Sequence, residues 1–330
     1  MEDAPRTLTR ADGELERRLE PHRGELTGYC YRMLGSPFEA EDAVQETLIR
    51  AWRGLDRFEG RAQLRSWLYR IATNVCLDML EGRQRRARPM DLGPAQEPDA
   101  KHLNTLPETT WIQPIPDGLL APEGDPADVA VARETIRLAF VAALQHLPPR
   151  QRATLILCEV LRWQASEVAE LLETSVASVN SALQRARATL AAADLDADAV
   201  PLDEIDGALL ARYVAAFEAY DLEALTSLIR EDAIQSMPPF DMWLRGRDDI
   251  FTWWWGPGIG CRGSRVLPTV SANGAPAFGQ YKPSPSGDGH DPWALQVLRL
   301  SPGGGIAELT FFLDTETLFP LFGLPPRLDA

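Results

Sequence analysis

Aromatic, amide and arginine side chains share one stretch of the chain, and this combination can bind unpaired nucleic acid. Trp67, Tyr69, Arg70 and Asn74 fall on a predicted helix, and an arginine run follows from Arg83 to Arg88. Aromatic rings stack on unpaired bases, and guanidinium groups follow the phosphate backbone. The alternative is that the rings belong to a core and the arginines face solvent. For Trp67 both interpretations hold in part, because its ring can pack beneath the preceding loop.

A second set of polar side chains lies on two helices expected over residues 166–190, joined by a tight turn near residues 173–175. In a helix-turn-helix, the second helix of such a pair enters the major groove. Amide side chains can read adenine edges, whereas arginine and serine can hold phosphates or guanine. An ordinary helical hairpin would give the same pattern. The outward-facing residues predicted to contact DNA are Ser178, Asn180, Ser181, Gln184, Arg185 and Arg187.

The sequence offers no pattern typical of catalysis or metal binding. Its four cysteines are scattered without a CxxC pair, which fits a reducing compartment and no metal site. His290 is the one histidine of the last third, and no acid–base pair is apparent there. We therefore expect no catalytic residue, metal or cofactor. Nothing resembles a signal peptide, and no apolar run reaches about 18 residues, so we expect a cytoplasmic protein that does not contact a membrane.

Charge is distributed unevenly along the 330 residues, a length that indicates two to three domains. The net charge of −15 argues against free binding to DNA, yet residues 61–90 hold seven arginines against two acidic residues. The acidity lies in residues 96–126, with a net charge of −5, and in residues 196–330, with −10. A basic patch beside an acidic domain is thus a feature that the function must explain.

The elements that must position these side chains are helical at first and mixed later. Gly35–Pro37 separates two helices, the second of which is expected over residues 39–55, and Ser66 is a reasonable N-cap for a helix over residues 67–82. Helices are expected again over residues 129–146 and from Leu147 onward. The C-terminal part should hold short helices and then an antiparallel meander, which makes an α+β domain. Its strands are expected at residues 266–271, 275–282, 293–300 and 306–313.

Between the helical segments lies a linker with eight prolines over residues 89–126, which predicts an extended chain. Its segment Thr109–Leu120 is too apolar for a free tether, although an acidic, Pro-rich stretch can also be a disordered spacer. The side chains expected to dock on another part of the protein are Trp111, Ile112, Ile115 and Leu119.

Two long stretches carry a resemblance to a known family. "EDAVQETLIRAWRGLDRFEGRAQLRSWLYRIATNVCLDMLEGRQRR" resembles region 2 of extracytoplasmic-function (ECF) sigma factors, and "LPPRQRATLILCEVLRWQASEVAELLETSVASVNSALQRARATL" resembles region 4. Residues 203–322 look like a SnoaL-like domain, a cone of bent sheet closed by helices. The resemblance implies two all-α sigma domains and an α+β cone. The expected divisions are region 2 at 10–92, the linker at 93–126, region 4 at 127–195 and the cone at 203–330.

The resemblance also implies partners and roles: a promoter-specificity subunit that binds the RNA polymerase core, through its β′ clamp helices and β flap, and promoter DNA. Asp42, Gln45, Glu46 and Ile49 would face the clamp helices. In region 4, Asn180 and Ala182 stand where many members carry basic residues, which puts the promoter read in doubt. The residues implied for the −10 element are Gly60, Arg61, Ala62, Gln63, Leu64, Trp67, Arg70, Asn74, Arg83, Arg85 and Arg86.

The C-terminal domain is expected to regulate, by packing on the docking residues of the linker and on the two DNA-binding domains. A small ligand could instead occupy a cone lined by aromatic residues, although such residues are more often core. Two rival functions remain: a one-component helix-turn-helix regulator with a ligand-sensing cone, and a cyclase or hydrolase fused to a DNA-binding module. The aromatic residues in question are Trp243, Trp253, Trp254, Trp255, Phe278 and Phe311.

Overall fold

The computed structural model describes residues 18–55, 58, 63–120, 135–191, 200, 205 and 207–329. The chain forms two compact units. The helical unit comprises residues 1–84, 119–132 and 144–193, and the sheet unit comprises residues 85–118, 133–143 and 194–330. The segment 85–118 therefore folds with the C-terminal part of the chain, although it follows the first helices in sequence.

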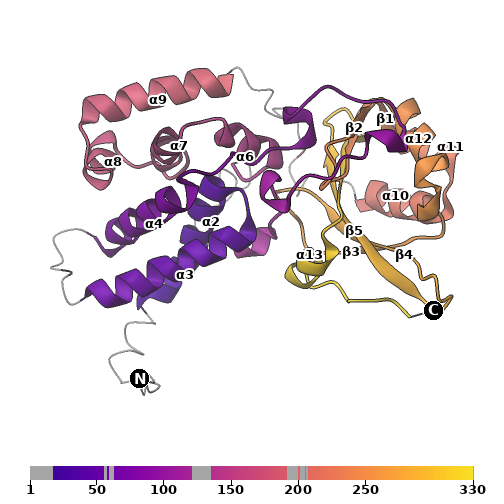
Figure 1. Ribbon diagram of the computed structural model, residues 1–330, viewed down its shortest axis with the longest axis horizontal. Coiled ribbons are helices and arrows are strands. Elements are labelled where there is room, and N and C mark those ends of the chain that lie inside the picture. Colours follow the sequence, from indigo (N-terminus) through magenta and orange to yellow (C-terminus); the bar gives the residue numbers. More distant parts are fainter. Residues whose placement is uncertain are drawn as a thin grey trace, which may run out of the picture. The chain divides into compact units, whose positions relative to one another are not determined.

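Three helices form the first half of the helical unit (Figure 1): α2 (Arg23–Leu34), α3 (Pro37–Gly54) and α4 (Leu64–Leu80). Gly35 ends α2 in the left-handed conformation, with φ of 74°, and Ser36 caps α3 by accepting a hydrogen bond from the Glu39 amide. The Gly-Ser-Pro break was thus predicted correctly. The N-cap of α4 was not, because the helix begins at Leu64 and Ser66 lies inside its first turn.

The second half of the helical unit contains α7 (Pro149–Leu155), the π-helical turn η7 (Ile156–Val160), α8 (Ala165–Leu171) and α9 (Val176–Ala191). The predicted helix-turn-helix is present as α8, a short turn and α9. Glu173 in the turn has φ of 52°, a conformation that favours glycine, and Ser175 accepts a hydrogen bond from the Ser178 amide. Gln164 is the N-cap of α8.

The sheet unit contains one mixed sheet of six strands in the order β2-β1-β6-β5-β4-β3. The helices α10 (Gly207–Ala219), α11 (Leu222–Leu228) and α12 (Arg247–Trp255), the turn η9 (Pro257–Cys261) and α13 (Thr315–Leu321) accompany it. The strands are β1 (Ile229–Ser236), β2 (Trp243–Arg245), β3 (Arg265–Pro268), β4 (Ala277–Pro283), β5 (His290–Leu300) and β6 (Ile306–Phe312).

Four of these strands, β3 to β6, form the predicted antiparallel meander, whereas β1 and β2 were not predicted. β1 pairs with β6 in parallel, and β2 pairs with β1 at the edge of the sheet. β1 escaped notice because its middle residues, Glu231 and Asp232, are exposed acids that do not suggest a strand. β5 begins at His290, three residues before the strand expected from residue 293. Long-range pairing, rather than local pattern, therefore decides the sheet order.

The linker is extended between short 3₁₀ turns, as predicted: η3 (Pro89–Asp91), η4 (Ala100–His102), η5 (Glu108–Thr110) and η6 (Asp117–Leu119). Figure 1 shows this purple segment running beside β1 and β2. The next helix in the sequence is α6 (Leu138–Gln145). The predicted helical residues 129–134 lie outside the described residues.

Candidate polymerase, DNA and linker-docking sites

The face of α3 predicted to contact polymerase is open to solvent. Asp42, Gln45 and Ile49 are exposed, and Ile49 has 43% of its surface accessible. Glu46 is half-buried, and its carboxylate accepts a hydrogen bond from Arg50 at 2.6 Å. Trp52 is 41% accessible and was missed, although its i+3 spacing from Ile49 placed it on the same face. The face combines carboxylates with exposed apolar side chains.

The face of α4 predicted to hold the −10 strand is partly accessible. Asn74 is exposed, and Arg70 is half-buried with its guanidinium beside α8. The ring of Trp67 packs on Phe58, with ring centroids 5.0 Å apart, so it does pack on a residue of the preceding loop. The DNA-binding roles of these side chains stay predictions.

The loop before α4 is only partly described. Gln63 is exposed, and Leu64 is half-buried at the start of the helix. The predicted contacts Gly60, Arg61 and Ala62 lie outside the described residues.

The arginines that follow α4 differ in exposure and in their partners. Arg85 is exposed, and Arg83 is exposed with an ion pair to Glu39 at 2.5 Å. Arg86 was predicted to hold phosphates, but it is buried and donates to the carbonyl oxygens of Glu108, at 3.1 Å, and Trp111, at 2.6 Å. Its guanidinium satisfies backbone acceptors of the docked linker, and its role in holding phosphates stays a prediction.

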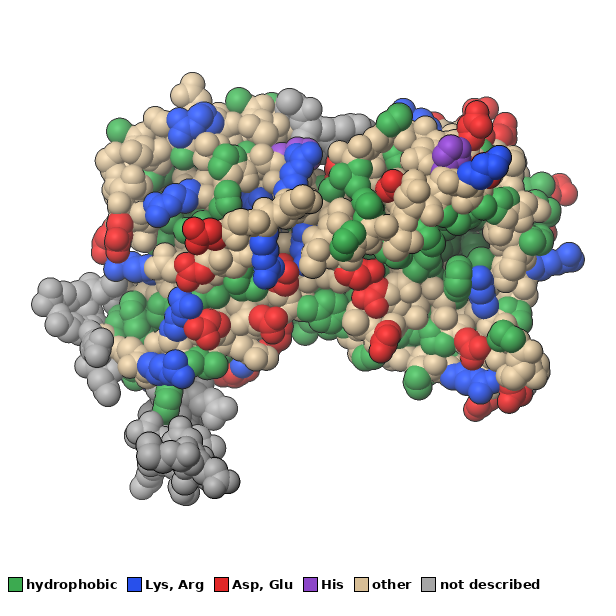
Figure 2. All heavy atoms as spheres, viewed as in Figure 1, with side chains coloured by type: hydrophobic (Ala, Val, Ile, Leu, Met, Phe, Trp, Pro, Cys, Tyr) green, Lys and Arg blue, Asp and Glu red, His purple; other side chains and the backbone are tan. Residues whose placement is uncertain are grey.

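The exposed face of α9 presents all six of the side chains predicted for the −35 duplex. Arg187 forms an ion pair with Glu159, a residue of η7. Acidic and basic side chains are interspersed over the face of the helical unit that Figure 2 shows. The exposed residues are Ser178, Asn180, Ser181, Gln184, Arg185 and Arg187.

Three of the four predicted docking residues are buried: Trp111, Ile112 and Ile115 are each 2% accessible or less. Leu119 was predicted to dock with them, but it is 45% accessible.

Hydrogen bonds attach the linker to the strands and loops of the sheet unit at points between Gly93 and Asp117. At the β2 edge, the Trp243 indole N–H donates to the Gly93 carbonyl at 2.9 Å, and the Gln96 amide donates to the Trp243 carbonyl at 2.9 Å. Farther on, the Leu106 amide donates to the Pro239 carbonyl at 3.0 Å. Trp243, which was expected to line the cone, thus holds the linker on a sheet edge that would otherwise be unpaired.

The loop of residues 271–275 binds the far end of the linker. The Asp117 carboxylate accepts hydrogen bonds from the Ser271 hydroxyl at 2.6 Å and from the Gly274 amide at 2.9 Å. The Asn273 amide group accepts from the Ile115 amide at 2.9 Å and donates to the Ile136 carbonyl at 2.6 Å. Residues on both sides of the segment 121–134 are therefore tied to one loop of the sheet unit.

The interior of the cone is filled by its own side chains. A cavity of about 20 Å³ remains among Trp253, Trp254 and Phe311, which is room for about one water molecule. Trp253, Trp254, Phe278 and Phe311 are buried in the core, which agrees with the core interpretation of these aromatic residues, whereas Trp255 is 38% accessible.

Buried polar groups in the cone bind one another. Tyr213 donates to Gln296, Gln296 to Gln280 and Gln280 to the Ser264 hydroxyl, at 2.9, 2.9 and 3.0 Å. Burial raises the pKa of Tyr213, so its hydroxyl stays protonated as the donor at the start of this chain. Amides and a neutral phenol supply no acid–base pair, and these bonds instead satisfy polar groups in the core.

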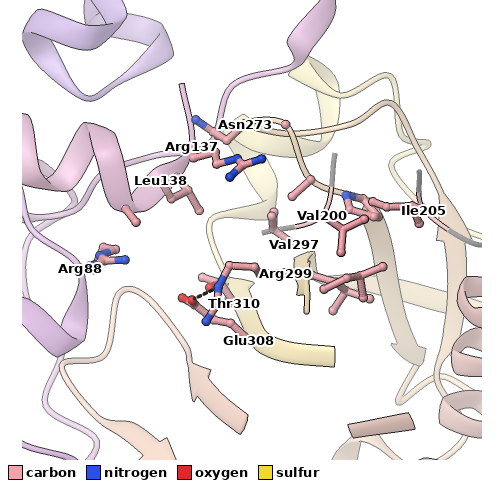
Figure 3. Close-up of a pocket in the computed structure, with 16 residues that line it drawn as sticks. Arg88, Arg137, Leu138, Val200, Ile205, Asn273, Val297, Arg299, Glu308 and Thr310 are labelled. Carbon is pink, nitrogen blue, oxygen red and sulfur yellow. Dashed lines mark hydrogen bonds and ion pairs between the residues drawn. The ribbon is translucent and has the colours of Figure 1, made fainter. Parts of the chain in front are cut away.

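A second cavity, of about 50 Å³, lies on the opposite face of the sheet (Figure 3). Val297 and Thr310 contribute to its wall, and Arg299 donates to Glu308 at 3.1 Å within it. The described residues include no cluster of three or more potential metal ligands from His, Cys, Asp and Glu. Among the same residues, no helix is both long and apolar enough to cross a bilayer.

Comparison with known proteins agrees with this arrangement. Residues 19–86 match Sigma-70 region 2, and residues 137–190 match Sigma-70, region 4. The chain is 45% identical to the ECF RNA polymerase sigma factor SigG of Mycobacterium tuberculosis (strain ATCC 25618 / H37Rv) over 326 residues, which cover 96% of this chain and 85% of that protein.

Solved structures include similar folds. The crystal structure of the Mycobacterium tuberculosis ECF sigma factor SigJ superposes with a TM-score of 0.59 and 22% identity, covering 95% of this chain and 99% of that one. A SnoaL-like protein of unknown function from Burkholderia thailandensis matches 32% of this chain and 96% of its own, with 17% identity and a TM-score of 0.25. Because the match to SigG extends over nearly the whole chain, this protein belongs to the ECF RNA polymerase sigma factor family, whose members are not enzymes and bind the polymerase core and promoter DNA to start transcription.

Proposed function

We propose that α3 docks this sigma factor on the polymerase core, that α4 holds the melted −10 strand and that α9 enters the −35 major groove. The proposal that α9 binds the −35 duplex is supported by the exposure of all six polar side chains on this helix. The exposed carboxylates and apolar side chains of α3 suit a charge-matched interface with an apolar centre.

We further propose that the C-terminal domain restrains transcription by sequestering the linker. In ECF sigma factors, the linker is expected to run through the polymerase active-site cleft and RNA exit channel. A linker that is hydrogen-bonded to the sheet unit at Gly93, Gln96, Leu106, Ile115 and Asp117 is not free to follow that path. Docking on the domain and entry into polymerase therefore compete, and the docked state lowers the concentration of competent protein.

In vitro transcription with core polymerase tests the restraint directly. Asp117→Ala removes two hydrogen bonds from the loop of residues 271–275 and should raise transcription at subsaturating sigma concentration. Asp99→Ala is the matched control, because it removes the same linker charge at a carboxylate whose partner is the neighbouring Lys101. Equal transcription by both variants, or a decrease specific to Asp117→Ala, would contradict the proposed restraint.

A further inference from the structure

The predicted −10 surface of α4 faces the first helix of the helix-turn-helix within the helical unit. The Arg70 guanidinium lies 3.7 Å from the Glu170 carboxylate and donates to the Glu170 carbonyl at 3.3 Å. A cleft of about 210 Å³ separates the two helices. Its lining residues are Gln63, Ser66, Trp67 and Arg70 from region 2, and Glu167, Glu170 and Leu171 from α8.

The charges in this cleft resemble those of a complex with nucleic acid. Arg70 supplies a cation on the α4 side of the cleft, and Glu167 and Glu170 supply anions on the α8 side. A carboxylate paired with arginine makes the same kind of charge-assisted contact as a phosphate. The acidic edge of α8 and a single DNA strand therefore cannot occupy the Arg70 side of α4 together.

Packing beneath the cleft holds the two regions together. The Tyr69 ring meets the Trp163 ring edge-on, with centroids 5.1 Å apart, and the Arg65 guanidinium lies over Trp163 at 5.6 Å. Arg152 donates to the Met33 carbonyl at the end of α2 and to Gln145. Burial lowers the pKa of Arg152 to about 10, a value at which it still carries its charge at neutral pH.

The same contact leaves hydrogen bonds unmade. Within the part of the chain that the structure describes, three buried donors at this interface lack a partner: Arg70 Nε, Arg152 Nε and Trp163 Nε1. A buried donor without a partner is costly, and each of these would gain water or a phosphate when the regions separate. The pair between half-buried Arg70 and exposed Glu170 adds little stability of its own. Separation of α8 from α4 therefore costs little free energy.

From these contacts we infer that α8 acts as an internal mimic of the promoter strand, covering Arg70 in the free protein and leaving when the core polymerase separates regions 2 and 4. The inference rests on the proposed role of α4 in binding the −10 strand. While α8 covers Arg70, a single strand cannot pair with this guanidinium. It assigns Glu170 the role of competitor and Trp163 that of the packing residue that keeps the competitor in place.

Binding of a fluorescein-labelled single-stranded −10 oligonucleotide to the full-length protein, followed by anisotropy, tests the inference. Glu170→Gln removes the competing charge and should tighten binding by about 1.5- to 5-fold. Glu223→Gln, at an exposed acid in α11 of the sheet unit, is the matched control and should leave the Kd unchanged. Trp163→Ala should tighten binding as well if its circular dichroism spectrum is that of the wild type. If that variant is misfolded, the result for Glu170→Gln is the test of the inference.

A second measurement separates this inference from the role of α4 itself. In holoenzyme with core polymerase the regions are already apart, so Glu170→Gln and wild type should bind the promoter equally. If holoenzyme binds promoter but Glu170→Gln leaves the affinity of the free protein at the control value, the mimicry is wrong and the role of α4 stands. If Arg70→Ala leaves promoter binding by holoenzyme intact, Arg70 is not a promoter contact, and both proposals fail at this residue.

Discussion

Asn273 and Ile115 are joined by a reciprocal pair of hydrogen bonds, although 157 other residues separate them in the sequence. The Ile115 amide donates to Asn273 Oδ1 at 2.9 Å, and the Asn273 amide donates to the Ile115 carbonyl at 3.1 Å. Asn273 is buried at 2% accessibility and has φ of 53°. One residue of the C-terminal domain thus satisfies both backbone groups of a linker residue, as a neighbouring strand would.

Asn273→Ala should loosen the end of the linker. The substitution leaves the Ile115 amide and the Ile136 carbonyl without their side-chain partners, and alanine is strained at a positive φ. We expect a loss of about 2–5 kcal/mol of local stability. Hydrogen exchange of a peptide spanning residues 111–118 would report it as faster exchange. Asn273→Gly, which tolerates the backbone conformation, should lose less, and unchanged exchange in the alanine variant would refute the prediction.

Glu108→Gln should stabilise the docked linker at neutral pH. Burial raises the pKa of Glu108, and the nearby Asp314 carboxylate raises it further, while Arg86 opposes the shift. A carboxyl group with a raised folded-state pKa binds more protons when the protein is folded. The free energy of unfolding therefore falls as the pH rises from the unfolded-state pKa through the folded-state pKa. The variant should therefore melt at a higher temperature than wild type at pH 7 and at the same temperature below the unfolded pKa.

Thermal melts of both proteins over a pH series provide the test of this carboxyl group. A difference in Tm that persists unchanged at the lowest pH would mean that the effect of the amide is not electrostatic.

Ile49→Glu should weaken binding to core polymerase. Ile49 is an exposed apolar residue of the proposed α3 interface, and placing a further carboxylate there costs apolar contact. We expect a five- to thirtyfold increase in Kd, or about 1–2 kcal/mol. Ile259→Glu is a matched control, since Ile259 is 44% accessible in the sheet unit. Both variants should keep the wild-type Tm, and equal Kd values for the two would exclude Ile49 from the interface.

Arg185→Ala and Glu159→Gln should change the salt dependence of −35 binding in opposite directions. Arg185 is exposed on α9, and its removal should reduce the slope of log K against log salt by about 0.9 if it contacts a phosphate. Glu159→Gln releases Arg187 from its ion pair and should tighten binding. Duplex binding over a series of salt concentrations provides both slopes. A steeper slope for Arg185→Ala would contradict the assignment.

The local elements of the helical unit were predictable because their signals lie within a few residues. Gly35, Ser36 and Pro37 specify the end of one helix and the start of the next by backbone conformation and capping alone. Ser175 likewise marks the start of α9, and the helical period of the residues that follow places their polar side chains outside. The side chains proposed to read DNA could thus be named without coordinates.

Predictions that depended on a single residue agreed less well with the structure. Arg86 belongs to a basic run, but its position beside two linker carbonyls makes it part of the docked linker. Ser66 resembles a cap, but the helix had already begun at Leu64. The position of Arg86 depends on its contact with the linker, and the N-cap of α4 depends on where the helix begins.

The sequence by itself determined the helices, the helix-turn-helix, the family and the apolar character of the linker. The tertiary structure decided where that linker lies: Trp111 and Ile115 are buried, and Asn273 and Trp243 supply hydrogen bonds from far along the chain. It also placed Glu170 beside Arg70. The physical reason is that capping and periodicity act over one or two turns, whereas the partner of an unpaired backbone group or a half-buried charge depends on which distant segment folds against it.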